Sequence, residues 1–354
     1  MKVLKGYQVI GSNETNAILY KKNKIYLSSL NFEDIQSLLT LKTTLFKKFM
    51  SNFRLFERMF RLNIRASLML TKSKIVISKD SEVIMIDISK KDIKTVYKST
   101  SNFSTPLCFS KPLTKEYLFL FGDYGSNNQK TEVKIYGVDY KLNIHTLYRF
   151  KEGKIRHIHN IVPKYDASGY YILTGDNEKN AGIYFYEIAT RNMQEVLIGK
   201  SYYRSVAAMS IKSGLIYITD SVEEQNKVFL YDESQNKLKL VKSINGPSIY
   251  SIINGDVLYY STSVESSEKG FILNKMLSTK TAKGVLSKCF NVSYINSDLD
   301  YKKMIEFKKD FLPYKLFQYG TVQFSSSLDS GSDKIYIYVI SAKKFDNCSI
   351  ILNK

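Results

Sequence analysis

Two histidines lie two residues apart in the stretch Lys154-Ile-Arg-His-Ile-His-Asn160, with Arg156 beside them. Alternate residues of an extended segment point to the same side, so His157 and His159 can act together. Imidazole titrates near neutral pH, which suits an acid/base pair. Two imidazoles with nearby carboxylates are also a donor set for a divalent metal. A third interpretation is that both side chains donate to backbone carbonyls and hold strands together, and the sequence leaves all three open.

Three carboxylates and a second arginine follow at similar positions in later repeats. Asp176, Asp220 and Glu265 each come just after an apolar run, where they could cap a turn or serve as acid/base groups at a glycosidic bond. The planar guanidinium of Arg204 suits a sugar carboxylate or a phosphate, or an ion pair with Asp176 or Asp220. Loops carry function while strands carry packing, so these residues are predicted to line a site at the rim of a repeat fold.

A repeated strand–turn–strand pattern must position these candidate site residues. Paired apolar segments recur about every 45 residues from residue 68 to the end, and we read them as 75–78 with 83–87, 116–121 with 133–138, 170–174 with 182–187, 215–220 with 227–232, 257–261 with 270–274, and 334–339 with 349–352. This period predicts an all-β protein, a β-propeller of six blades in 68–354, with seven as the alternative. The N-terminal strands in 1–30 are expected to complete the last blade and close the ring, which removes exposed strand edges.

Residues 31–67 break the β pattern and are predicted to be helical. Asn31 suits an N-cap, and Leu45, Phe49, Phe53, Phe56 and Phe60 share one face at helical spacing. The rest of the surface is basic, with Lys47, Lys48, Arg54, Arg58, Arg61 and Arg65. Such a helix could contact an anionic membrane through 41–65. The alternative is that it packs across one end of the propeller with its arginines in solvent.

Composition narrows the class of protein. The chain has 354 residues, 44% hydrophobic and 13% aromatic without tryptophan, which favours strands. Its net charge of +19 comes with scattered lysines and no recognition motif, so we expect no nucleic acid partner. Three distant cysteines, and no apolar leader or membrane-length segment, favour a cytoplasmic protein. The basic helix adds the option of a peripheral place at the inner face of the membrane.

The stretch 121–265 resembles a family of bacterial β-propellers related to the BNR-repeat, sialidase-like superfamily, often encoded among capsule or O-antigen genes. The matching pieces, in order, are Phe121-Gly-Asp-Tyr124 with Asn127, Arg156-His-Ile-His159, Thr174-Gly-Asp176, Tyr203-Arg204, Thr219-Asp220 with Asn226, and Ser261-Thr-Ser-Val-Glu265. Sialidases also have Asp-box turns with tryptophan and three arginines that converge on a carboxylate, whereas this chain offers only Arg156 and Arg204. The resemblance therefore implies a propeller with a polar axial site and not sialidase chemistry.

The prediction is a carbohydrate-active or carbohydrate-binding propeller that serves cell-surface polysaccharide synthesis. Whether it is an enzyme stays open; an enzyme version would be glycoside hydrolase-like, with acid/base groups from His157, His159, Asp176 and Glu265. Contacts to an acidic oligosaccharide or lipid-linked sugar are expected from Asp123, Tyr124, Arg156, Arg204 and Asp220. A divalent metal held by His157 and His159 is a further option. The alternative function is a non-catalytic scaffold that binds a membrane-associated glycosyltransferase or another partner protein.

Overall fold

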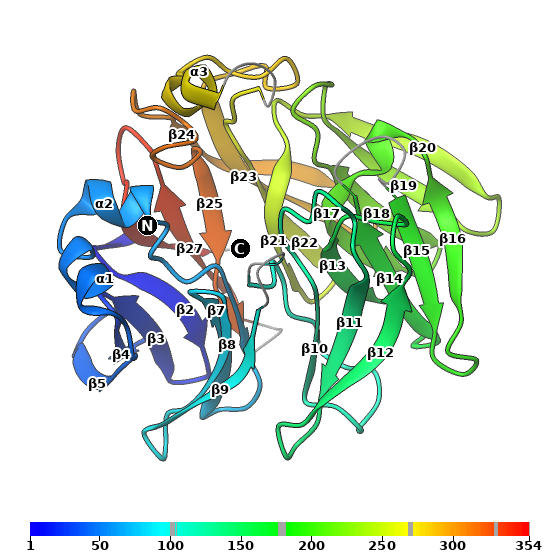
Figure 1. The fold of residues 1–354 in the computed structure, drawn as a ribbon. Helices are drawn as coiled ribbons and strands as arrows, with labels where there is room; N and C mark the ends of the chain where they lie inside the picture. The colour runs from blue at the N-terminus through cyan, green and yellow to red at the C-terminus, as the bar shows by residue number, and fades with distance from the viewer. Residues whose placement is uncertain (100–102, 104, 176–181, 268–271, 329–331, 354) are drawn as a thin grey trace.

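The strands of this chain form seven sheets arranged as blades around one axis (Figure 1). The computed structural model describes residues 1–99, 103, 105–175, 182–267, 272–328 and 332–353. The predicted β-propeller is confirmed, and its blade number is seven, the stated alternative, not six. The extra blade comes from the N-terminal residues, which the six-blade prediction had assigned to ring closure and a helix.

The strands of the first three blades follow the order of the chain. The first blade contains β2 (Gln8–Ser12), β3 (Asn16–Lys21), β4 (Lys24–Ser29) and β5 (Gln36–Thr40), the second β6 (Ala66–Met69), β7 (Lys74–Lys79), β8 (Glu82–Asp87) and β9 (Asp92–Lys98), and the third β10 (Phe119–Gly122), β11 (Val133–Val138) and β12 (Ile144–Phe150). The short β26 (Ser326–Ser327) runs parallel to β2. An isolated bridge between Ser110 and Leu120 extends the third blade toward the axis.

The next three blades repeat the four-stranded unit. The fourth contains β13 (Ile158–Pro163), β14 (Gly169–Thr174), β15 (Gly182–Glu187) and β16 (Met193–Ile198), the fifth β17 (Ser205–Ile211), β18 (Gly214–Thr219), β19 (Lys227–Asp232) and β20 (Lys237–Ser243), and the sixth β21 (Ser248–Asn254), β22 (Val257–Thr262), β23 (Cys289–Asn296) and β24 (Tyr301–Lys308). A 3₁₀ turn at Ser201–Tyr203 precedes β17.

The two ends of the chain close the ring in the seventh blade. Its strands are β25 (Thr321–Phe324), β27 (Lys334–Ile340), β28 (Cys348–Asn353) and, outermost, β1 (Lys2–Lys5), which pairs antiparallel with β28. Of the N-terminal strands predicted to complete the last blade, β1 alone does so, while β2, β3 and β4 belong to the first blade. This pairing covers the edge of β28 that would otherwise stay open.

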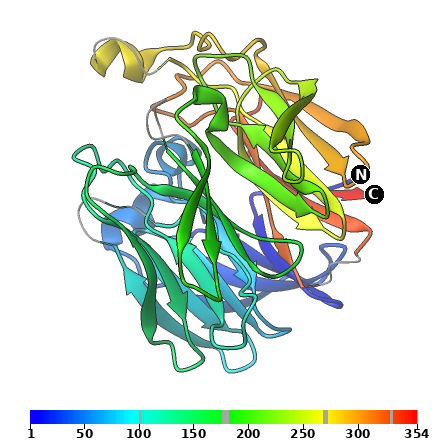
Figure 2. The same ribbon diagram turned by 90° about the vertical axis from the view of Figure 1, so that its right-hand side faces the viewer.

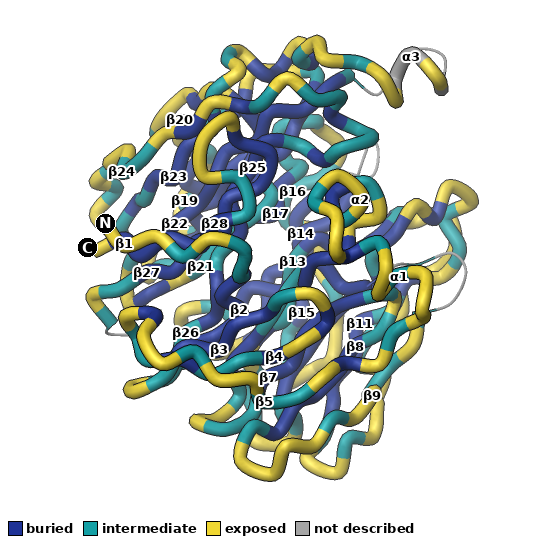
Figure 3. Tube along the Cα trace, turned by 90° about the vertical axis from the view of Figure 1, so that its left-hand side faces the viewer, coloured by how far each residue is buried: buried dark blue, intermediate teal, exposed yellow. Residues whose placement is uncertain are grey.

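The core lies in the inner strands, which are packed between the sheets of neighbouring blades. All six residues of β14 are buried, whereas the outermost strands β9 and β20 are largely exposed (Figure 3). The third and fourth blades approach closely at Gly122, where a β-carbon would lie 2.7 Å from atoms of Ile158. A glycine is therefore required at the point where the chain enters the axial site.

The helical segment is shorter than predicted. Residues 36–40 form β5 at the edge of the first blade, and only α1 (Leu45–Met50) and α2 (Arg54–Met59) are α-helical. The N-cap is Thr44, whose side chain accepts from the Lys47 amide, and not Asn31. Because the leucines of 36–40 fit either a helix face or a strand, pairing with β4 decided the outcome.

A third helix, α3 (Ile272–Leu277), lies where a strand was predicted, and the true partner of β22 is β23. The first two residues of that predicted strand, 270 and 271, lie outside the described residues. The described residues contain three α-helices of six residues each, and none of them has the length and apolar character needed to cross a lipid bilayer.

One face of the propeller collects two kinds of connection. The innermost strand of each blade begins at this face, so the link from the preceding blade lies here. The second strand ends at this face, so the link from the second to the third strand lies here too. The segment with α1 and α2 joins β5 to β6, and α3 lies between β22 and β23. Figures 2 and 3 show all three helices on the same side of the molecule. We call this the helical face.

Candidate functional site

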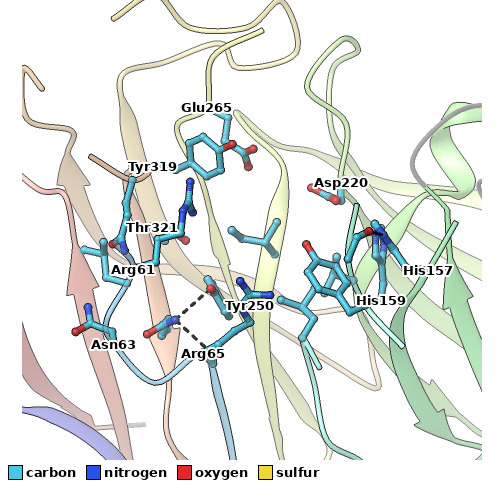
Figure 4. Close-up of a pocket in the computed structure, with 18 of the residues that line it drawn as sticks. Arg61, Asn63, Arg65, His157, His159, Asp220, Tyr250, Glu265, Tyr319 and Thr321 are labelled. Carbon is cyan, nitrogen blue, oxygen red and sulfur yellow. Dashed lines mark hydrogen bonds between the residues drawn. The ribbon is translucent and has the colours of Figure 1, made fainter. Parts of the chain in front are cut away.

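A cavity of about 560 Å³ lies at the axis of the propeller (Figure 4). Its walls come from the second to the seventh blade and carry three arginines, two histidines and two carboxylates among the described residues. Three of the basic side chains occupy the same structural position: Arg65, His157 and Arg204 each immediately precede the first residue of an innermost strand. Innermost strands converge on the axis, which brings these distant positions together.

The structure brings most of the predicted site residues into this cavity. His157, His159, Tyr124, Arg204, Asp220 and Glu265 all line it. Asp176 falls outside the described residues. Asp123 and Arg156 are not among the lining residues.

Asp123 belongs to a hydrogen-bond network between the second and third blades. Its carboxylate accepts from the Lys134 amide at 2.9 Å and from the hydroxyls of Tyr97 and Tyr136 at 3.3 Å. Burial raises the pKa of Asp123 to about 6, although these hydrogen bonds favour the charged form. This placement gives Asp123 a structural role.

Arg156 supports the loop that carries Tyr124. Its guanidinium donates to the Ser126 carbonyl at 2.8 Å and to the Asn128 side chain. Arg156 therefore holds one wall of the cavity from outside, at a position predicted to touch substrate.

The two histidines face each other through their Nε2 atoms, 2.9 Å apart. His157 Nδ1 contacts the Gly125 carbonyl, and His159 Nδ1 lies 2.9 Å from the Ser205 carbonyl. Carbonyls only accept, so both Nδ1 atoms carry protons, and a bond between the Nε2 atoms needs one more proton. The bonded pair therefore holds a single positive charge, and it also stitches the third, fourth and fifth blades together.

An aromatic ring lies against this pair. The Tyr124 ring centroid is 4.6 Å from that of His157, and the Arg65 guanidinium lies 5.4 Å from the Tyr124 ring centroid. Arg65 also donates to the Thr105 carbonyl at 3.3 Å. A cation above an aromatic face is stabilised by the ring quadrupole, so Tyr124 and Arg65 form one wall of the cavity.

Arg204 and Asp220 form an ion pair across the fifth blade. The Arg204 Nε and Nη2 atoms lie 3.2 and 3.1 Å from Asp220 Oδ2, which confirms one of the two arrangements that the sequence left open. The Asp220 amide also donates to the Arg204 carbonyl at 3.0 Å. The pair fixes the Arg204 guanidinium at the cavity wall.

Glu265 lies on a different wall from the histidines (Figure 4). It is buried, and it accepts a hydrogen bond from Ser263 Oγ. Nearby on the seventh blade, Gln318 Oε1 and Thr321 Oγ1 are buried and have no hydrogen-bond partner among the described residues. Buried polar atoms are normally satisfied, so these two call for water or a hydroxylated ligand in the cavity.

An amide network links the ring-closing blades to this cavity. Gln323 donates through Nε2 to the Tyr250 hydroxyl at 3.1 Å. Its Oε1 atom accepts from Gln8 Nε2 at 2.8 Å. Gln8 in turn bonds both backbone polar groups of Ile64, the residue before Arg65. These contacts fix the orientation of Tyr250 and the path of the chain into β6.

Arg61 and Arg65 are cavity residues that the sequence reading assigned to a helix surface. Arg61 follows the α2 C-cap with φ 52°, the left-handed conformation that ends helices, and the chain turns there into the cavity. It lies 5.8 Å from the Tyr319 ring centroid and donates to the Lys315 carbonyl at 3.3 Å. The sequence did contain a clue to Arg65, because it lies directly before an apolar strand segment, as Arg204 does.

No group of three or more histidine, cysteine, aspartate or glutamate side chains in the described part of the chain could hold a metal ion. The two Nε2 atoms face each other, and the described residues supply no third ligand. The geometry of the two Nε2 atoms suits a shared proton. A divalent metal held by His157 and His159 stays a prediction.

Comparison with known protein families and with curated proteins finds no match. Solved structures do match over the whole chain, at low identity. A structure of the mitotic checkpoint complex aligns with a TM-score of 0.57 and 7% identity, covering 100% of this chain and 93% of that chain. PorZ, a surface component of the type-IX secretion system of Porphyromonas gingivalis, gives 0.53 and 8%, covering 100% of this chain and 39% of that one.

Oligogalacturonate lyase of Vibrio parahaemolyticus aligns with a TM-score of 0.51 and 8% identity, covering 97% of this chain and 91% of that chain. At this level of identity the matches establish the propeller fold alone.

Proposed function

We propose that the protein binds an acidic carbohydrate in its axial cavity. The observation that carries the proposal is the pairing of cationic groups with aromatic rings and buried polar atoms on the walls of one cavity. Arg61, Arg65 and Arg204 outnumber the carboxylates Asp220 and Glu265 there, and the histidine pair adds positive charge when it holds its shared proton. Guanidinium groups suit carboxylate or phosphate groups on a sugar.

Aromatic and polar groups supply the remaining contacts of a sugar site. Tyr124, Tyr250 and Tyr319 line the cavity and offer ring faces or hydroxyls, and Gln318 and Thr321 offer buried polar atoms for sugar hydroxyls. The oligogalacturonate lyase of Vibrio parahaemolyticus has a similar propeller fold, so this architecture is compatible with an acidic sugar ligand. Fold likeness alone assigns no activity.

Binding is proposed ahead of turnover because the two carboxylates already have partners. Asp220 is paired with Arg204, and Glu265 accepts from Ser263. His157, His159 and Glu265 remain the candidate acid/base groups if turnover occurs. From the sequence resemblance, we further propose that the ligand belongs to a cell-surface polysaccharide or its lipid-linked precursor.

Calorimetric titration tests the proposal with a uronic acid oligosaccharide and a neutral oligosaccharide of equal length. We expect the acidic one to bind at least about tenfold more tightly, since hydrogen bonds to charged groups are stronger than neutral ones. Arg61→Gln should weaken acidic binding by roughly tenfold. The control variant is Arg149→Gln, which removes an exposed arginine of β12 that is paired with Glu132. It should bind the acidic oligosaccharide as wild type does.

Equal affinity for the two oligosaccharides, or unchanged affinity in Arg61→Gln, would overturn the proposal. The same samples show whether the acidic oligosaccharide is consumed. Consumption that is lost in His157→Ala would extend the proposed function from binding to catalysis.

A further inference from the structure

In the part of the chain that the structure describes, the exposed phenylalanines lie on one face of the propeller. The seven that are exposed among the described residues are Phe46, Phe49, Phe53, Phe56, Phe60, Phe311 and Phe345. Five belong to the α1–α2 segment, Phe311 lies between β24 and β25, and Phe345 lies between β27 and β28. All three connections belong to the helical face. Exposed leucines join them there: Leu45 and Leu55 in the α1–α2 segment, and Leu273, Leu277 and Leu286 in the α3 connection. We call this set the apolar rim.

Inward ion pairs hold the α1–α2 segment against the seventh blade, and its phenylalanines lie on the outer side. Arg54 bonds both carboxylate oxygens of Asp346 at 2.8 and 2.9 Å. Arg58 is 3% exposed and lies 2.6 Å from Asp310. Two of the arginines predicted to face solvent or lipid therefore anchor the segment to the seventh blade and its preceding connection.

The exposed charge of the connections that carry the apolar rim is one-sided. In 41–65, 263–267, 272–288, 309–320 and 341–347 the acidic residues are Glu57, Glu265, Asp310 and Asp346. Glu57, Asp310 and Asp346 pair with Arg54 or Arg58, and Glu265 is buried in the cavity wall. The exposed charges of the same connections include the lysines Lys42, Lys48, Lys280, Lys283, Lys288, Lys343 and Lys344. Apolar side chains among exposed lysines match an anionic lipid surface, where rings enter the interface and ammonium groups meet phosphates.

We propose that the helical face docks on an anionic lipid bilayer through the apolar rim. The rim is carried by four connections of neighbouring blades, from the sixth blade through the seventh to the link between the first and second, so one lipid surface can contact it at several points. A protein partner would be expected to need acidic groups that complement these lysines. If the proposed function holds, docking would turn the mouth of the cavity toward the headgroups, where a lipid-linked acidic sugar would be presented.

Co-sedimentation with vesicles of phosphatidylcholine alone, or mixed with phosphatidylglycerol, tests the proposal. The variant Leu45→Ser/Phe311→Ser removes the two most exposed rim residues, at 84% and 85%, from two connections. The control Tyr140→Ser/Tyr165→Ser removes two residues, each 67% exposed, from hairpins outside the helical face. Wild type and control should sediment with the anionic vesicles and much less with the neutral ones, and the rim variant should bind at least about tenfold more weakly.

Three outcomes would overturn the proposal. The first is that wild type stays in the supernatant with anionic vesicles, and the second is that the rim variant sediments as well as wild type. Self-association without lipid, measured by analytical ultracentrifugation and lost in the rim variant, would instead assign the rim to a second copy of the chain. Calorimetry separates this test from the cavity, because the rim variant should bind the uronic acid oligosaccharide as wild type does.

Discussion

His157 and His159 meet through their Nε2 atoms at 2.9 Å while each Nδ1 faces a backbone carbonyl. This arrangement assigns the pair one shared proton between the two Nε2 atoms. It also combines two interpretations of the sequence, since the histidines bridge blades and still line the cavity.

The first prediction is that His159→Gln weakens the affinity for a uronic acid oligosaccharide several-fold, because the shared proton that gives the pair its positive charge is lost. His145→Gln is the matched control, because His145 is exposed and paired with Asp139 on the third blade. Calorimetric titration is the measurement, and wild-type affinity in His159→Gln would refute the shared charge.

The second prediction concerns Asp220, which neutralises Arg204 in the cavity. Asp220→Asn should bind the acidic oligosaccharide several-fold more tightly, since Arg204 then keeps its full charge for the ligand. The same change should lower the free energy of unfolding by about 1–3 kcal/mol, because a buried charged hydrogen bond is lost. Asp232→Asn, at the end of β19 in the same blade, is the control. Weaker binding in Asp220→Asn would mean that Asp220 itself contacts the sugar.

The third prediction separates an anchoring arginine from a ligand-binding one. Arg58→Gln should lower the free energy of unfolding by about 1–3 kcal/mol, because the buried charged hydrogen bonds of Arg58 to Asp310 and to the Phe317 carbonyl are lost while Lys309 still pairs with Asp310. Arg61→Gln, three residues away and exposed, should change stability by less than about 0.5 kcal/mol. Urea denaturation measures both, and equal losses would show that Arg61 is also structural.

The fourth prediction follows from the raised pKa of Asp123. Burial lifts this pKa from 3.8 to about 6, so between these values the folded state binds more protons than the unfolded state. Stability contributed by this group therefore falls as the pH rises through that window, by about 3 kcal/mol for two pKa units.

Asp123→Asn removes that titration. Its stability relative to wild type should increase by about 3 kcal/mol between pH 4 and pH 6 and stay level above about pH 7. Denaturation series at fixed pH values measure the difference. A constant difference across the window would show that Asp123 titrates normally in the folded state.

The sequence by itself determined the architecture and much of the site, because both follow local rules. Apolar runs such as Tyr170 to Thr174 recur at a fixed period and become the buried inner strands of blades. A residue just before or after such a strand falls near the axis, which is why His157, Arg204, Asp220 and Glu265 could be placed together without coordinates.

Tertiary structure decided what depends on long-range partners. Residues 36–40 fit a helix as well as a strand, and pairing with β4 added the seventh blade. The helical periodicity of 45–60 placed the phenylalanines on one face, but only Asp310 and Asp346, some 250 to 290 residues away, turned Arg58 and Arg54 inward. Asp123 and Arg156 do not line the cavity for a similar reason, because the groups that bind their side chains lie in other strands and loops. Local pattern fixes periodicity and burial, whereas the direction of a polar side chain depends on which distant group can satisfy it.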